Sequence, residues 1–280
     1  MKKWAMVIDV AKCTNCNNCV LATKDEHVGN DFPSYAAPQP STGHEWISID
    51  RHTRGSGSMV DVTYVPRMCN HCDDAPCVRA AGDGSVYQRP DGIVIIDPVK
   101  ARGRKDLVDS CPYGSIYWNE EANLPQKWIF DAHLLDAGWA KPRCVQACPT
   151  GALDAICESD EKIESIKERL DLEVLKPELG TRPRVFYRNL RRTARLFLGG
   201  NVVNKNVDGS AENVAQARVE LSIDGRVISG STDAFGDFKI DDLSSHSDYQ
   251  LRITHAIFGE AIAKGVLTDS TYLGSIALSR

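Results

Sequence analysis

The sequence predicts an α+β protein in which a cysteine-rich first part precedes a C-terminal antiparallel β-sandwich. All ten cysteines lie between Cys13 and Cys157, in a region where short apolar runs alternate with long loops. From about residue 196 onward, apolar and polar residues alternate in short runs separated by turns, which is typical of a sandwich. The 280 residues are enough for two or three modest domains.

The cysteine-rich part predicts short strands followed by one helix. The run "MVIDV" at residues 6–10 is a short apolar segment, and "DGIVIIDPVK" at residues 91–100 indicates a turn, a strand and a proline stop. Residues 159–175 place apolar side chains at helical spacing, and Ser159 or Asp160 can cap the start of that helix.

An arginine-rich stretch, residues 181–195, follows the predicted helix. It holds six arginines in fifteen residues, which is typical of a solvated linker. The same stretch contains Phe186, Tyr187 and Leu190, which need an apolar cover, so a tether lying on an acidic partner surface is the second interpretation. The sequence leaves both interpretations open.

Three runs in the last part of the chain show the period-two alternation of strands. They are residues 217–223, 238–240 and 249–253, and turn sequences such as "IDGR" and "AFGD" separate them. This part contains no cysteine and no cluster of titratable groups. We therefore assign it no chemistry.

Composition and charge exclude some classes of function. The net charge of −5 gives no sign of nucleic-acid binding, and no apolar run is long enough to span a bilayer. The start, "MKKWAMVIDVAKC", has no apolar signal core, and the twin-arginine pairs lie far inside the chain. We expect a cytoplasmic protein, although a partner's signal could export a complex.

The cysteines form two triads and two Cys-Pro pairs. The triads are Cys13, Cys16 and Cys19, then Cys69, Cys72 and Cys77; the pairs are Cys111 before Pro112 and Cys148 before Pro149. In bacterial two-cluster ferredoxins, a run of four cysteines before a proline gives three ligands to one [4Fe–4S] cluster and the fourth to its neighbour. Two triads and two Cys-Pro donors therefore predict two complete clusters.

Positions that would serve further clusters hold other residues. These vestigial positions are Thr23, Ala81, Arg104, Leu107, Trp128, Asp131 and Cys144. Thr23 and Ala81 stand where each triad would donate a ligand to a neighbour, and the triads that would receive those ligands are eroded too. The losses are thus paired, and Cys144 and Cys157 are left over.

Other metals and disulfides explain the pattern less well. Structural zinc uses C-x-x-C pairs, normally two of them, and does not require triads or Cys-Pro. Close C-x-x-C spacing in a chain expected in the cytoplasm favours metal over disulfides. His71 can be a ligand, but a hydrogen bond from it to a cluster sulfur, or a plain surface position, is the better interpretation. A different metal held by Asp131, His133 and Cys144 is disfavoured, because Trp128 filling a vestigial site explains the same residues.

Residues 1–190 resemble the iron–sulfur subunits of the dimethyl sulfoxide reductase family of molybdopterin oxidoreductases. The phrases that carry the resemblance are "VIDVAKCTNCNNC", "CNHCDDAPC", "DGIVIIDP", "CPYGSIYWNEE", "CVQACPTGAL" and "KPELGTRPRVFY". Among these subunits the chain is most similar to those of aromatic-ring hydroxylases and transhydroxylases. The tail, with "ARVELSIDGRVISGSTDAFGDFKIDDL", is similar to transthyretin-like and carboxypeptidase-regulatory-like sandwiches.

The resemblance implies how the ligands pair and what the partner holds. It assigns Cys148 to the first triad and Cys111 to the second triad. It also implies a large catalytic subunit with bis-molybdopterin guanine dinucleotide, which the first cluster would lie nearest. Family members typically carry four clusters in a row, so the empty position fed by Thr23 interrupts the chain of clusters, and transfer between the two that remain is expected to be slow.

The predicted domains follow from these assignments. Residues 1–52 with 119–158 form a first ferredoxin-like module, and residues 53–118 form a second. Residues 159–195 are the helix and arginine-rich linker, and residues 196–280 are the sandwich. We expect an electron-transfer subunit that carries no catalytic residue and partners a large molybdopterin subunit, with an external electron acceptor as a second candidate partner. The alternatives are a structural subunit whose clusters mainly hold the fold, and an independent ferredoxin.

Overall fold

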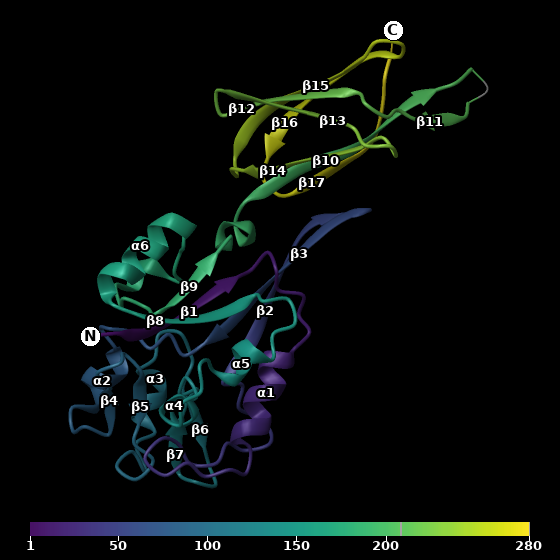
Figure 1. The fold of residues 1–280 in the computed structure, drawn as a ribbon. Coiled ribbons are helices and arrows are strands. Elements are labelled where there is room, and N and C mark those ends of the chain that lie inside the picture. The colour runs from purple at the N-terminus through teal and green to yellow at the C-terminus, as the bar shows by residue number, and fades with distance from the viewer. Residues whose placement is uncertain (208, 280) are drawn as a thin grey trace. The chain divides into compact units, whose positions relative to one another are not determined.

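The computed structural model describes residues 1–207 and 209–279, which form two compact units (Figure 1). The first unit combines Met1–Arg51 with Tyr64–Leu190, and the second combines His52–Thr63 with Arg191–Arg280. Helices and strands occur together, which confirms the α+β class. Among the described residues, no helix is long and apolar enough to cross a membrane.

A three-stranded sheet organises the first unit. Its order is β8 (Leu153–Glu158), β1 (Lys3–Asp9) and β9 (Val185–Arg188), with β8 antiparallel and β9 parallel to β1. Met6 and Ile8 point to one face and enter the main core, because side chains alternate along a strand. Ala5 points to the other face, where the helix α6 (Asp160–Leu170) covers it with Ile163.

The helix α6 confirms the predicted helix at residues 159–175, although it ends at Leu170. The Ser159 side chain accepts a hydrogen bond from the backbone N–H of Lys162, so Ser159 is the N-cap. Asp171 follows in the left-handed conformation and ends the helix.

The arginine-rich stretch is not a free linker, and both predicted interpretations were wrong for its middle part. Val185–Arg188 is the strand β9, and Phe186 and Tyr187 are buried inside the first unit. The Tyr187 hydroxyl donates to the carbonyl oxygen of Pro66 at 2.9 Å. The aromatic side chains are therefore covered by this chain itself, because pairing with β1 places them in the sheet.

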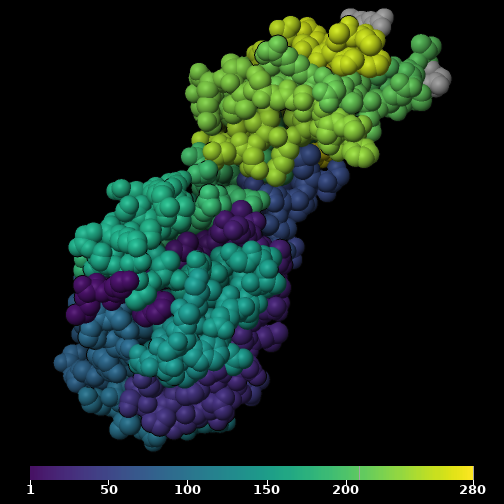
Figure 2. Space-filling view, viewed as in Figure 1, coloured from purple at the N-terminus to yellow at the C-terminus, as the bar shows by residue number. Residues whose placement is uncertain are grey.

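Short elements and long loops make up the rest of the first unit. The helices are α1 (Asn18–His27), α2 (Pro76–Ala81), α3 (Asp106–Asp109), α4 (Ala132–Asp136), α5 (Arg143–Gln146) and the 3₁₀ turns Pro177–Leu179 and, at the edge of the second unit, Leu190–Thr193. The paired strands are β4 (Val86–Gln88) with β5 (Val94–Ile96) and β6 (Tyr117–Asn119) with β7 (Leu124–Gln126). In Figure 2, residues near the start of the chain (purple) lie against teal residues from beyond position 100, so this unit joins distant parts of the sequence.

The hairpin of β2 (Ile47–Ser56) and β3 (Met59–Met68) corrects the predicted domain boundaries. Its tip, His52–Thr63, groups with the second unit, whereas residues 53–118 had been predicted as one ferredoxin-like module. Met1–Arg51 and Tyr64–Leu190 form one compact unit and are not divided further, so the two-module division stays a prediction.

Two four-stranded sheets enclose the core of the second unit. One contains β11 (Ala211–Asn213), β10 (Leu196–Lys205), β14 (Asp237–Leu243) and β17 (Thr271–Ala277); the other contains β13 (Arg226–Ser231), β12 (Arg218–Ile223), β15 (Ser247–His255) and β16 (Gly259–Leu267). Val219 and Leu221 face Leu198 in a shared apolar core. The expected strands are thus present, but β17 pairs with β10 in parallel, so the sandwich is not purely antiparallel. Its likeness to transthyretin-like sandwiches stays a prediction.

Candidate functional site

The second triad and the middle Cys-Pro cysteine line a single cavity in the first unit. Its walls include the four thiols of Cys69, Cys72, Cys77 and Cys111, and also Asn70, His71, Pro112, Tyr113, Val94 and Lys127. Cys69 and Cys72 come from the loop after β3, Cys77 from the first turn of α2, and Cys111 follows α3. Pro76 at the first helical position starts α2 directly beside the third thiol of the triad.

Burial sets the protonation of these thiols. It raises the pKa of Cys72 to about 12 and that of Cys77 to about 11, and the neighbouring thiols add to both shifts. A thiol must lose its proton to bind iron, so loading this cavity releases protons and replaces mutual repulsion with metal–sulfur bonds. The cavity is therefore suited to a positively charged metal centre and unsuited to free thiolates.

The first triad gathers with the last Cys-Pro cysteine. The charges of Cys148 and Cys16 act on the Cys13 thiol, and those of Cys13, Cys148 and Cys16 act on the Cys19 thiol. Cys13 and Cys16 lie in the loop after β1, Cys19 lies in the first turn of α1, and Cys148 follows α5. Asn15 and Asn17, at φ 57° and 60°, adopt the left-handed conformation, which lets the loop of the first triad bend around the site of the four thiols.

Cys148 differs from the other thiols because backbone N–H groups donate hydrogen bonds to its sulfur. The Ala152 backbone N–H donates to Sγ at 3.2 Å, and the Thr150 hydroxyl lies 3.7 Å from it. Burial alone would raise the pKa of Cys148, but these hydrogen bonds, with one from the backbone of Leu153, outweigh it and lower the pKa. Pro149 starts the turn that brings these donors back to the sulfur.

The two thiol sets differ in their exposure to solvent. Cys16 is exposed and Cys13 and Cys148 are half-buried, so the first set lies at the surface of its unit. Cys19 is buried, as are Cys69, Cys72 and Cys77 of the second set, whereas Cys111 is half-buried. The first set is therefore more exposed to a partner than the second, which is mostly buried.

Each set has the composition that a [4Fe–4S] cluster needs, which is four thiolates, one for each iron. Among the described residues, no three His, Cys, Asp or Glu side chains come together closely enough to hold a single metal ion. A cluster spaces its thiolates more widely than the roughly 3.8 Å of a tetrahedral zinc site, because each thiolate binds a different iron. The two thiol sets thus fit clusters without forming a single-ion site.

The vestigial positions around Thr23 are packed core. Thr23 is buried, and its hydroxyl donates to the Cys19 carbonyl oxygen at 2.9 Å. Trp128, Asp131 and Cys144 are fully buried. Asp131 accepts from the Trp128 indole N–H at 3.2 Å, and burial followed by the Asp131 charge raises the pKa of Cys144 well above its ordinary value.

Aromatic rings occupy the space beside Trp128. Its ring stacks on Phe130 with centroids 4.8 Å apart, and Phe130 also contacts Trp4 at 5.9 Å. His71, which lines the cavity of the second set, meets Trp128 at 5.6 Å in an edge-to-face contact. That Trp128 fills the place of a former cluster stays a prediction.

The other vestigial positions are also filled. Ala81 ends α2 and packs with Leu107 in an apolar cluster. The Arg104 guanidinium donates to the Ala81 carbonyl oxygen at 3.5 Å and pairs with Asp83 and Asp106. Cys157, the second leftover cysteine, lies on β8 opposite Trp4.

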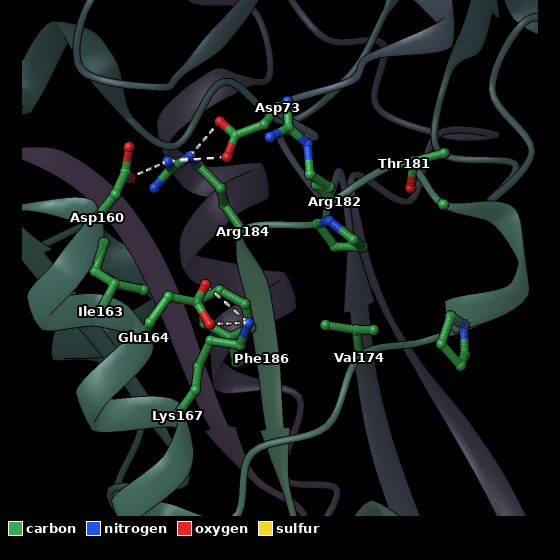
Figure 3. A pocket seen from close by; sticks show the side chains of 13 residues that line it. Asp73, Asp160, Ile163, Glu164, Lys167, Val174, Thr181, Arg182, Arg184 and Phe186 are labelled. Carbon is green, nitrogen blue, oxygen red and sulfur yellow. Dashed lines mark hydrogen bonds and ion pairs between the residues drawn. The ribbon is translucent and has the colours of Figure 1, made fainter.

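Two residues near the second set escaped the sequence-based predictions. Arg184 is buried and bridges Asp73, directly after Cys72, to Asp160 at the start of α6, at 2.7 and 2.6 Å (Figure 3). The other is Lys127, which follows Gln126 and directly precedes the apolar run "WIF" in "PQKWIF". A lysine in an apolar run was the only signal, and it does not reveal which cavity the side chain enters.

The pocket around Arg184 carries its own counter-charges. Lys167 pairs with Glu164 at 2.8 Å and lies 5.1 Å from the centre of the Phe186 ring (Figure 3). Because each of these charges has a partner within the pocket, we interpret it as a buttress for the loop of the second set.

Two thiol sets, one at the surface and one buried, in a loop-rich α+β unit define a ferredoxin-type iron–sulfur protein. The 4Fe-4S dicluster domain family matches residues 60–156. The pyrogallol hydroxytransferase small subunit of Pelobacter acidigallici is 45% identical over 99% of this chain and 100% of its own length. A tetrathionate reductase subunit of Salmonella typhimurium is 35% identical over 67% of this chain and 73% of its own length. The arsenate respiratory reductase iron–sulfur subunit ArrB of a Shewanella strain is 30% identical over 65% of this chain and 94% of its own length. The chain therefore belongs to the iron–sulfur subunits of the dimethyl sulfoxide reductase family.

Proposed function

We propose that this chain is an electron-transfer subunit that carries two [4Fe–4S] clusters. Cys13, Cys16, Cys19 and Cys148 would hold the first, and Cys69, Cys72, Cys77 and Cys111 would hold the second. The observation that carries the proposal is the gathering of eight thiols into two sets of four, with Cys144 and Cys157 left aside. The clusters would supply one-electron transfer, and the chain would hold, orient and insulate them.

The proposed partner is a large subunit with bis-molybdopterin guanine dinucleotide that hydroxylates or transhydroxylates a phenolic ring. The likeness to a pyrogallol hydroxytransferase small subunit over the full chain supports this. The surface position of the first thiol set supports docking there, because electron transfer needs a short distance between centres. Leu21, two residues after the triad, is 62% exposed and supplies apolar area for such a contact.

A structural role is the second candidate, and the filled middle position favours it. Trp128, Asp131 and Cys144, which we interpret as the remnant of a linking site, are packed in the core, so we propose no metal centre between the two clusters. In this role the clusters mainly hold loops that bury little apolar surface. An independent ferredoxin is less well supported, and isolation of the chain as a stable monomer would favour it.

Metal analysis of the purified complex tests the number of clusters. We expect about eight irons and about eight acid-labile sulfides per chain, four of each for every cluster. Cys77→Ser should lower both by about four and Cys157→Ser by none, since Cys157 is no proposed ligand. A value near twelve would contradict the two-cluster proposal, because it requires a third filled site.

Spectroscopy of the same complex separates electron transfer from a structural role. The complex is reduced with its aromatic substrate or with dithionite, and both clusters are followed by electron paramagnetic resonance. Electron transfer predicts that at least one cluster changes redox state at potentials reached in turnover. If neither cluster does so, the structural candidate is correct.

A further inference from the structure

The cavity of the second thiol set contains one buried cation. Lys127 directly follows β7, and its side chain is 2% exposed. Its Nζ donates to the carbonyl oxygens of Val94 at 2.5 Å and Trp128 at 3.2 Å. An ammonium has three N–H donors, so one remains after these two bonds. Within the described part of the chain no carboxylate pairs with it.

A buried ammonium without a carboxylate is costly unless another negative charge lies nearby. The four thiols of the second set line the same cavity as Lys127. Burial raises the pKa of Cys77 and Cys111, and the Lys127 charge acts in the opposite direction on both thiols. The four thiolates of a bound cluster are therefore the missing counter-charge.

His71 supplies a second donor to the same cavity. Its Nδ1 accepts a hydrogen bond from the Val94 backbone N–H at 3.0 Å, so the ring proton lies on Nε2. Nε2 is buried and has no hydrogen-bond partner in the protein. A buried N–H left unpaired in a cavity lined by thiols points to an acceptor that arrives with the cluster.

The backbone of Val94 positions both groups. Its N–H holds His71 and its carbonyl oxygen holds Lys127. Val94 lies on the strand β5, which pairs with β4 and is buried. The two donors are therefore both hydrogen-bonded to the backbone of one buried strand residue.

We propose that Lys127 and His71 raise the reduction potential of the second cluster. Reduction brings one electron from the partner or a chemical reductant and adds one negative charge to a mostly buried cavity. Burial disfavours that charge, whereas an ammonium and an unpaired N–H donor in the same cavity favour it. In the first set, by comparison, the charges that act on Cys13 and Cys19 are those of its own thiols.

This inference rests on the proposed two-cluster function, and a redox titration of the loaded complex separates the two. Iron content of the unaltered complex tests the clusters, and their midpoint potentials, followed by electron paramagnetic resonance, test Lys127. Lys127→Met should lower the equilibrium constant for reducing the second cluster at least tenfold, which is about 59 mV for one electron. The first cluster should keep its potential, and Lys127→Arg should restore most of the loss in the second.

Lys24→Met is the matched control. Lys24 also donates to two carbonyl oxygens, those of His44 at 2.8 Å and Ser41 at 3.5 Å, but it does not line the thiol cavity. This control should leave the potential of the second cluster unchanged. An unchanged potential in Lys127→Met, with iron content retained, would overturn the proposal.

If Lys127→Met loses the cluster, retention of the cluster in Lys127→Gln and Lys127→Arg decides whether the positive charge is required. If Arg keeps the cluster and Gln does not, the positive charge is required and the proposal holds. If all three variants lose it, the shape of the side chain matters and the charge does not, which overturns the proposal. His71→Leu should shift the potential in the same direction as Lys127→Met.

Discussion

Thr23 occupies the position where a fourth cysteine would follow the first triad. Its hydroxyl is bonded to the Cys19 carbonyl one turn earlier, and its side chain is buried. The residues that such a cysteine would have joined, Trp128 and Asp131, bond to each other instead. Thr23, Trp128 and Asp131 are therefore all buried and hydrogen-bonded within the core.

Removal of the Trp128 side chain should show how much that packing contributes to the stability of the fold. Trp128→Ala should lower the free energy of unfolding by about 3–5 kcal/mol, because a fully buried ring leaves a cavity. Chemical denaturation of the iron-loaded chain measures the change. Trp139→Ala is the control, since Trp139 is 41% exposed and its loss should cost under about 1 kcal/mol.

Thiol reactivity should follow the pKa of each cysteine once iron is removed. Only the thiolate is alkylated, and the thiolate fraction at a given pH rises as the pKa falls. Among the eight proposed ligands at about pH 7.5, Cys148 should therefore react first, and Cys72, Cys77 and Cys19, with pKa values of about 12, 11 and 11, last.

Raising the pH should reduce this difference in alkylation rate. Thiols with a high pKa form thiolates only at high pH, whereas Cys148 is ionised already at lower pH. Mass spectrometry of alkylated peptides measures the order. In the iron-loaded protein all eight proposed ligands should be protected, and Cys157 should react. Alkylation of Cys148 before iron removal would contradict its role as a ligand.

The strand β9 lies inside a charged stretch of sequence but carries buried aromatic side chains. Arginines flank it on both sides, yet Phe186 and Tyr187 are buried because β9 pairs with β1. Arg184, just before the strand, ties the loop of the second thiol set to α6 through Asp73 and Asp160. Local composition could not predict this, since every partner lies far away in sequence.

Arg184→Met should loosen the loop that carries Cys72. The side chain is 3% exposed and its two carboxylate partners are partly solvated, so we expect a loss of about 1–3 kcal/mol in unfolding free energy. On heating, the signal of the second cluster should disappear before that of the first. Arg182→Met is the control, because Arg182 pairs with Asp74 but is 67% exposed. Equal effects of the two variants would contradict this account.

The tip of the β2–β3 hairpin depends on one glycine. Gly55 has φ +88°, and a Cβ there would collide with the Met59 carbonyl oxygen and the Phe197 ring. Gly55→Ala should cost more than about 2 kcal/mol, by backbone strain plus the clash. Gly225→Ala, at φ +72° with open space around it, should cost about 1 kcal/mol by strain alone. Calorimetry of the two variants measures the difference.

At the scale of the whole molecule, one unit holds all the thiols and the other holds none. The second unit is not a simple C-terminal domain, since residues 52–63 belong to it. Arg54 at the hairpin tip pairs with Asp61 and with Asp241 of the sandwich, at 2.5 and 2.9 Å. A boundary drawn from sequence alone misses this, because a hairpin inserted from upstream leaves no compositional mark.

Electron exchange between the two proposed clusters should be slow. The residues proposed as the remnant of a linking site, such as Trp128 and Cys144, are packed core, and tunnelling falls steeply with distance. When substrate or reduced viologen is mixed with the complex, the two clusters should reach their final states at clearly different rates. Rapid-freeze electron paramagnetic resonance measures both. Simultaneous reduction would contradict the gap and favour a filled middle site.

The sequence by itself determined the chemistry of this chain. Triads at short spacing and prolines after single cysteines are local patterns, and local spacing decides which thiols can wrap one metal centre. Alternation in the tail likewise predicted strands, because side-chain period follows directly from backbone geometry. These features need no knowledge of distant contacts.

Only the tertiary structure decided what lies around those thiols. It brought Cys148 to the first triad and Cys111 to the second, buried β9, and placed Lys127 and His71 in the second cavity. Each of these depends on contacts between residues far apart in the chain, to which single-residue propensities are blind. Burial also sets the dielectric around a charge, so the electrostatic environment of each thiol set could be read only from the fold.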